Sequence, residues 1–223
     1  MLAVQWAERI LRRVDNTFPK SQKQNMPSKA NKLNNFVHAF GAARMLIQKA
    51  NVEGALLEGL ALYAALTDGF LRIGLVLKRQ IVKNTSEVDD LLIWQEKGGQ
   101  YYTERQIQRM AHAEGIITQE ILDELSALYD RRNDAIHKFF LTGLQYVDLP
   151  PFLERYEIMY KALNRIVYDL EAEQIREGVG MSAPTKTTKE DTLAILKDVA
   201  MKIDPKLAET IAMPSKPDST RRG

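Results

Sequence analysis

Apolar residues recur every three or four positions along most of this chain, which is the spacing of an amphipathic helix. The densest run, from about Val52 to Ile81, predicts a long helix at the centre of the fold. Similar spacing predicts helices over residues 32–50, 103–113, 118–140 and 148–177, and shorter ones over 2–15 and 190–203. The sequence therefore predicts an all-α fold, an antiparallel helical bundle of five to six helices with an N-terminal helical arm and a flexible C-terminal tail.

Polar stretches divide the chain into three parts. Residues 16–30 contain Pro19 and Pro27 and no acid, and residues 181–188 interrupt the helical spacing again. Both stretches are typical of linkers. We therefore expect a basic N-terminal helix and linker over residues 1–29, the bundle over 30–180, and a linker, a short helix and a disordered tail over 181–223.

Four glycines fall within the predicted central helix, namely Gly54, Gly59, Gly69 and Gly74. Each costs up to about 1 kcal/mol relative to alanine in a helix interior. Close approach of a neighbouring helix would compensate for this cost, so the glycines favour a central position for the helix.

Composition excludes several classes of protein. With 45% hydrophobic and 27% charged residues, the chain is not disordered throughout. The absence of cysteine and the presence of only three histidines exclude a disulfide framework, cysteine-ligated zinc, thiol catalysis and a histidine-rich metal centre. Motifs for common cofactors are absent, so we expect neither a metal nor a cofactor.

The N-terminal residues lack the apolar core of a signal peptide. The most apolar stretch of the chain carries Glu58, Asp68 and Arg72, which a bilayer span would not tolerate. These features predict a soluble cytoplasmic protein without a membrane partner.

Charge is distributed unevenly. Residues 1–50 hold nine Lys or Arg and two acids, whereas residues 51–179 hold fourteen Lys or Arg and twenty-one acids. A basic arm beside an acidic body indicates either an anionic partner such as RNA or an arm that packs on its own body. Similarly, Trp6, Tyr101 and Tyr102 either stack on bases or serve the structure. The sequence leaves both questions open.

One cluster of polar residues carries recognisable chemistry. The segment YDRRNDAIHKFF places four residues between Arg132 and His137, with Asn133 directly after the arginine. This pattern resembles the signature of the HEPN superfamily. Arg105 and His112, with six residues between them, also fit the loose form of the signature, but no asparagine follows the arginine. We interpret that second pair as a coincidence.

The resemblance covers residues 30–178 and implies a function. Members of the superfamily are helical bundles, and many are metal-independent endoribonucleases of toxin–antitoxin, abortive-infection and CRISPR-associated systems. The resemblance implies that this chain cleaves RNA as a homodimer and leaves 2′,3′-cyclic phosphate ends. Arg132, Asn133 and His137 are the implied catalytic residues. An antitoxin or a nucleotidyltransferase is the implied regulatory partner. Some toxin members carry, two residues after the histidine, a tyrosine that such a partner modifies; here Phe139 has no hydroxyl.

The residue types fit this chemistry independently. RNA cleavage without a metal requires a base for the 2′-hydroxyl, an acid for the leaving 5′-oxygen, and cations for the charge on phosphorus. Histidine titrates near neutrality, and the arginine fork matches phosphate oxygens. On a straight helix Arg132 and His137 lie about 140° apart, so they cannot point in one direction. They could line the two sides of a cleft between two copies of the helix, which predicts a two-fold homodimer.

We expect three neighbours of the motif to bind the substrate, namely Arg131, Asp134 and Lys138. Alternatively, Arg131 lies on the solvated face of the helix. A structural interpretation of the whole motif is also open, in which His137 complements the helix dipole and Arg132 pairs with Asp130 or Asp134. The chain would then be a non-catalytic HEPN-like adaptor, or a protein that binds a ligand or nucleic acid.

Overall fold

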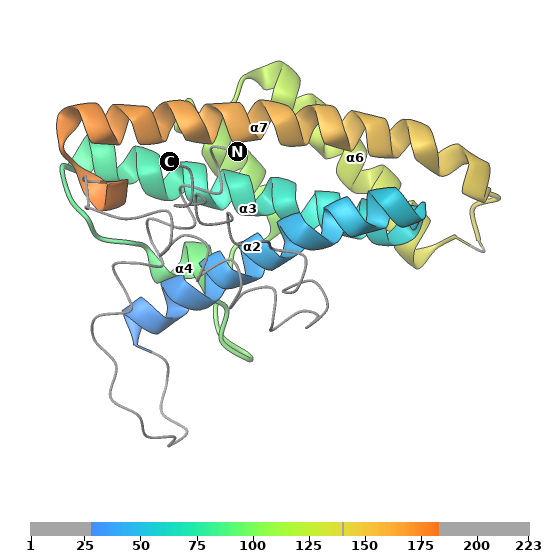
Figure 1. Cartoon of the computed structure of the whole chain (residues 1–223), viewed down its shortest axis with the longest axis horizontal. Coiled ribbons are helices and arrows are strands. Elements are labelled where there is room, and N and C mark those ends of the chain that lie inside the picture. The colour runs from blue at the N-terminus through green and yellow to red at the C-terminus, as the bar shows by residue number, and fades with distance from the viewer. Residues whose placement is uncertain (1–27, 140, 183–223) are drawn as a thin grey trace, which may run out of the picture. The chain divides into compact units, whose positions relative to one another are not determined.

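The computed structural model describes residues 28–139 and 141–182, and within them it contains six α-helices and no strand (Figure 1). The helices are α2 (Lys29–Glu53), α3 (Leu56–Lys83), α4 (Asp90–Ile93), α5 (Glu104–Ala113), α6 (Gln119–His137) and α7 (Leu149–Glu177), with short 3₁₀ turns at Tyr146–Asp148 and Gly180–Ser182. The prediction of an all-α bundle of five to six helices is confirmed for this part of the chain. The expected N-terminal helix, the C-terminal helix and the tail lie outside the described residues.

Helix α3 is the centre of the bundle, since it contacts each of the other five helices (Figure 1). Its most extensive contact is with α7. A methyl group at Gly59 would lie 3.2 Å from Leu153, and Gln174 donates a hydrogen bond to the Leu77 carbonyl. Residue numbers therefore rise together along α3 and α7, so these two helices run in the same direction. Helices α2 and α6, which precede them in the chain, run the opposite way.

The glycines of α3 allow its neighbours to approach closely. A Cβ atom at Gly69 would lie 2.7 Å from the ring of Phe40 on α2, and one at Gly74 would lie 3.2 Å from Ile116. The prediction was wrong for Gly54, which lies in the turn between α2 and α3 with φ of +68°. There glycine supplies a left-handed conformation that most residues disfavour.

Helix α3 is also the one helix of the described part that is long and apolar enough to cross a bilayer. Within its most apolar 18-residue stretch, 72% is buried inside the bundle. That is the pattern of the core helix of a soluble protein.

Hydrogen bonds with capping side chains determine where α5 and α6, the two helices that carry the candidate site, begin. The Thr103 side chain accepts a hydrogen bond from the Gln106 N–H, and the Gln106 side-chain oxygen accepts one from the Thr103 N–H, so α5 begins at Glu104. At the start of α6, the Thr118 hydroxyl accepts a hydrogen bond from the Ile121 N–H. Helix α6 ends at His137, three residues earlier than the apolar spacing predicts.

Candidate functional site

Arg132 lies in the interface between α5 and α6. Its Nη1 donates to Glu104 Oε2 at 2.7 Å, and both side chains are only 17% exposed. Its Nε and Nη2 donate to the Asn133 side-chain oxygen at 3.3 and 3.0 Å. The guanidinium is therefore held from two sides, by an acid on the neighbouring helix and by the next residue in its own helix.

An aromatic ring completes this cluster. The guanidinium carbons of Arg132 and Arg105 each lie 4.7 Å from the centre of the Tyr129 ring, and Arg105 also pairs with Asp130. Cation–π contacts of this kind contribute about 0.5–1 kcal/mol at exposed sites and more where water is excluded. Arg105 thus belongs to the packing of α5 on α6.

Burial determines the direction in which the pKa of Glu104 shifts. It raises the pKa of Glu104 above its ordinary value of 4.5, although the charge of Arg132 opposes the rise. Near this pair, Tyr156 of α7 is 1% exposed, and its hydroxyl has no hydrogen-bond partner among the described residues. Burial raises the pKa of Tyr156 as well, and the nearby charge of Glu104 adds to the rise. The inner side of the site is thus a low-dielectric environment.

His137 occupies a different environment. It is the last residue of α6 and its side chain is exposed. Because α6 is one continuous helix, Arg132 and His137 lie about 140° apart around its axis and about 7.5 Å apart along it. The structure brings Arg132 and Asn133 together and leaves His137 on another side of the helix.

The three flanking residues also have separate environments. Asp134 and Lys138 form an ion pair of 3.3 Å with each other on the surface of α6. Arg131 is exposed, and its guanidinium lies 5.3 Å from the ring centre of Phe152 on α7, at the side of an open groove of about 460 Å³. The structure does not gather these three residues into one surface with Arg132.

Sequence reasoning missed the partner of Arg132. The expected acids were Asp130 and Asp134, but these pair with Arg105 and Lys138, and Arg132 pairs with Glu104 instead. The only sequence signal for Glu104 is its place directly after the Thr103 cap, where an acid is common for reasons of the helix dipole alone.

Within the described residues, no group of three or more His, Asp or Glu converges in a way that would hold a metal ion. Comparisons with protein-family models, with curated proteins and with solved structures find no match for this chain. Fold and site together define a helical bundle whose helix α6 carries an Arg-Asn-x-x-x-His segment.

Proposed function

We propose that this chain is a metal-independent endoribonuclease of the HEPN type, cytoplasmic and homodimeric, with Arg132, Asn133 and His137 in its site. The observation that carries the proposal is the arrangement of α6. One uninterrupted helix holds Arg132 in a fixed orientation and presents His137, with a solvent-exposed imidazole, at its end.

Each residue has a role that its environment supports. Glu104 fixes one edge of the Arg132 guanidinium, while Asn133 occupies the other edge and would yield it to a phosphate. Phosphate oxygens then accept the two N–H groups that Asn133 releases, which is the bidentate geometry arginine favours. The exposed imidazole of His137 exchanges protons with the 2′-hydroxyl or with the leaving oxygen.

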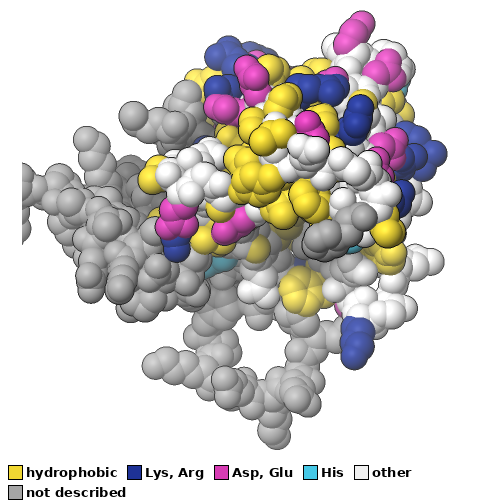
Figure 2. Space-filling model, turned by 90° about the vertical axis from the view of Figure 1, so that its right-hand side faces the viewer, with side chains coloured by type: hydrophobic (Ala, Val, Ile, Leu, Met, Phe, Trp, Pro, Cys, Tyr) yellow, Lys and Arg dark blue, Asp and Glu magenta, His cyan; other side chains and the backbone are white. Residues whose placement is uncertain are grey.

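The site needs a second chain because Arg132 and His137 face different directions. In the dimer, Arg132 of one chain and His137 of its partner flank the same phosphate. Exposed apolar side chains near the end of α6 provide a surface for that contact: Ile136 is 40% exposed, Leu141 84% and Val147 74%. Hydrophobic atoms gather on this end of the molecule in Figure 2. An antitoxin or nucleotidyltransferase that regulates the dimer stays a prediction.

The Arg132–Glu104 pair also favours a second candidate function. An ion pair that joins α5 to α6 is sufficient reason for an arginine at this position. In that case the chain is a non-catalytic HEPN-like adaptor or binding protein, and His137 is a surface residue.

The experiment that separates the two functions is RNA cleavage in EDTA by the purified protein. The variant Arg132→Lys retains the charge that Glu104 requires but lacks the fork, and His137→Ala removes the imidazole. The matched controls are Arg165→Lys and His112→Ala, outside the proposed site. We expect 2′,3′-cyclic phosphate products with wild type and controls and a loss of about 10²-fold or more with each site variant. Equal activity in all five proteins, or dependence on Mg²⁺, would contradict the proposal.

A further inference from the structure

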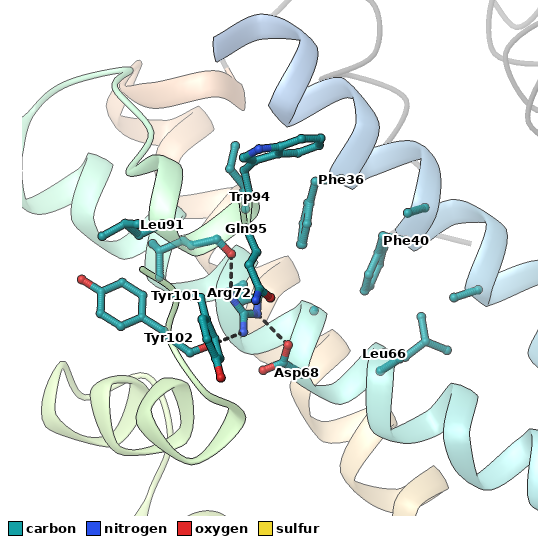
Figure 3. A pocket seen from close by; sticks show the side chains of 16 residues that line it. Phe36, Phe40, Leu66, Asp68, Arg72, Leu91, Trp94, Gln95, Tyr101 and Tyr102 are labelled. Carbon is teal, nitrogen blue, oxygen red and sulfur yellow. Dashed lines mark hydrogen bonds and ion pairs between the residues drawn. The ribbon is translucent and has the colours of Figure 1, made fainter. Parts of the chain in front are cut away.

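A cavity of about 300 Å³ lies between α2, α3, α4 and the segment that follows α4 (Figure 3). Phe36 and Phe40 of α2 and Trp94 stand on one side of it, and Tyr101 and Tyr102 stand on the other. The volume is at the lower end of the range for small-molecule sites. Aromatic side chains from three separate segments thus surround a space that the described residues leave open.

A polar pair lies between these aromatic walls. Arg72 Nε donates to Asp68 Oδ2 at 2.6 Å, and its two terminal nitrogens donate to the carbonyls of Leu92 and Tyr102, each at 3.0 Å. These bonds fix the orientation of the Asp68 carboxylate and tie the segment after α4 to α3. The pair is therefore rigid before any ligand arrives.

One oxygen of this pair has no partner. Asp68 Oδ1 is buried and accepts no hydrogen bond from the described residues. A buried charged acceptor without a donor is costly, and native structures leave few of them. The carboxylate lines the cavity, so a molecule within it that carries an N–H would satisfy this oxygen.

We infer that the cavity between α2, α3 and α4 binds a planar heteroaromatic ring with an N–H donor, that is, a nucleobase. The ring stacks on the aromatic walls, where each base–aromatic contact contributes about 1–3 kcal/mol. Its N–H donates to Asp68 Oδ1. The Gln95 amide, which lies beside the pair, supplies a further donor and acceptor to the ring edge (Figure 3).

The charges argue for a neutral ring over an organic cation. An aromatic cage with a carboxylate attracts quaternary ammonium groups. Here Arg72 lies against Asp68 and cancels its charge, so a cation gains little from the pair. A neutral N–H donor can still form a hydrogen bond with the buried Asp68 Oδ1.

The base has two possible sources, a free nucleoside or a base within single-stranded RNA. The cavity adjoins the Arg132 site, since Tyr102 precedes Glu104 by two residues and the charges of Asp68 and Arg72 act on the Glu104 carboxyl. An RNA strand could therefore reach both places. Base binding in the cavity does not depend on cleavage, so this inference stands apart from the proposed function.

Trp94 provides the measurement. The chain has two tryptophans, and Trp6→Phe leaves Trp94 as the sole one in an otherwise full-length protein. Adenosine, guanosine, cytidine, uridine and a short single-stranded oligonucleotide are titrated separately, and Trp94 fluorescence is followed. We expect saturable quenching by at least one nucleoside. Tighter binding of the oligonucleotide would identify RNA as the source, and equal or weaker binding would identify the free nucleoside.

Three variants test the geometry. Asp68→Asn replaces the acceptor with an amide that Arg72 holds in one orientation, and should weaken binding about ten- to a hundredfold. Ala65→Phe adds a large side chain at the wall of the cavity and leaves both residues of the polar pair in place, and should abolish binding. Asp169→Asn breaks the exposed Arg165–Asp169 pair on α7 and should leave binding unchanged. Melting temperatures identify any variant that is misfolded.

Absence of saturable quenching by all five probes would overturn the inference. Undiminished binding by both Asp68→Asn and Ala65→Phe would place the ligand elsewhere and overturn it as well. Tetramethylammonium that quenches Trp94 more strongly than any nucleoside would show a cation site instead.

Discussion

Arg132 and His137 belong to one short motif, yet the structure gives them opposite environments. Arg132 is mostly buried, pairs with Glu104 at 2.7 Å and lies against Tyr129. His137, five residues further on, is exposed at the last position of the same helix. The motif therefore joins a residue that helps hold α5 to α6 with one that the fold does not require.

Because of this difference, substitutions at the two residues should affect different properties, namely the folding stability and the catalytic activity. A substitution at Arg132 disturbs a buried charge, so its effect on activity includes an effect on folding. A substitution at His137 should act on chemistry alone.

Arg132→Ala should lower the free energy of unfolding by about 3 kcal/mol, because it leaves the Glu104 carboxylate buried without its partner. His137→Ala should change the same quantity by less than about 0.5 kcal/mol. Urea denaturation followed by circular dichroism measures both values. In the double variant Arg132→Ala/Glu104→Ala, part of the loss should be regained. Equal losses at Arg132 and His137 would show that the two side chains contribute equally to folding, contrary to their different burial.

Leu141→Asp combined with Val147→Asp should convert the dimer into a monomer at micromolar concentration. Both side chains are largely exposed in the segment between α6 and α7, so the charges would disrupt the proposed contact without entering the core. The matched control is Val82→Asp, which alters an equally exposed valine at the end of α3. Sedimentation should give about twice the 25.4 kDa chain mass for wild type and control. A wild-type monomer would refute the proposed dimer.

Glu104→Gln should alter the pH dependence of stability. Burial raises the pKa of Glu104 above 4.5, so the folded chain binds this proton more tightly than the unfolded chain. The stability from this proton is complete below pH 4.5 and is lost as the pH rises through the folded value. Relative to wild type, the variant should therefore gain stability across that window. Chemical denaturation at a series of pH values measures the difference, and a relative loss would show that Arg132 outweighs burial.

Lys138→Ala should have the smallest effect, at most about 0.5 kcal/mol. Its ion pair with Asp134 is exposed on both sides, and exposed pairs of this kind contribute little. Thermal denaturation at low and at high salt measures the contribution. A loss above 1 kcal/mol would mean that Lys138 makes a contact beyond the described residues.

Most of the helical part of the fold could be predicted from the sequence. Apolar spacing located all five long helices of the described part, and Thr103 and Thr118 marked the starts of α5 and α6 because their hydroxyls cap free N–H groups. These are local effects, and local effects are visible in sequence. The misplaced Gly54 shows the limit, since a glycine in a helix and a glycine in a turn are identical in the sequence.

The tertiary partners could not be predicted in this way. Glu104 lies 28 residues before Arg132, and nothing in the spacing indicates that α5 folds back on α6 in the register that joins them. For the same reason, the burial of Asp68 Oδ1 could not be predicted from the sequence. Its pairing with Arg72 follows from helical spacing, but its other surroundings come from α2 and from the segment after α4.

The claim that two chains build one site is tested most directly by mixing two inactive variants, Arg132→Lys and His137→Ala. In a mixed dimer, the intact Arg132 of one chain meets the intact His137 of the other, so one of the two sites is complete. Random exchange makes about half of the dimers mixed, and the account predicts about a quarter of wild-type RNA cleavage in EDTA. A mixture as inactive as either variant alone, although subunit exchange is verified, would contradict the composite site.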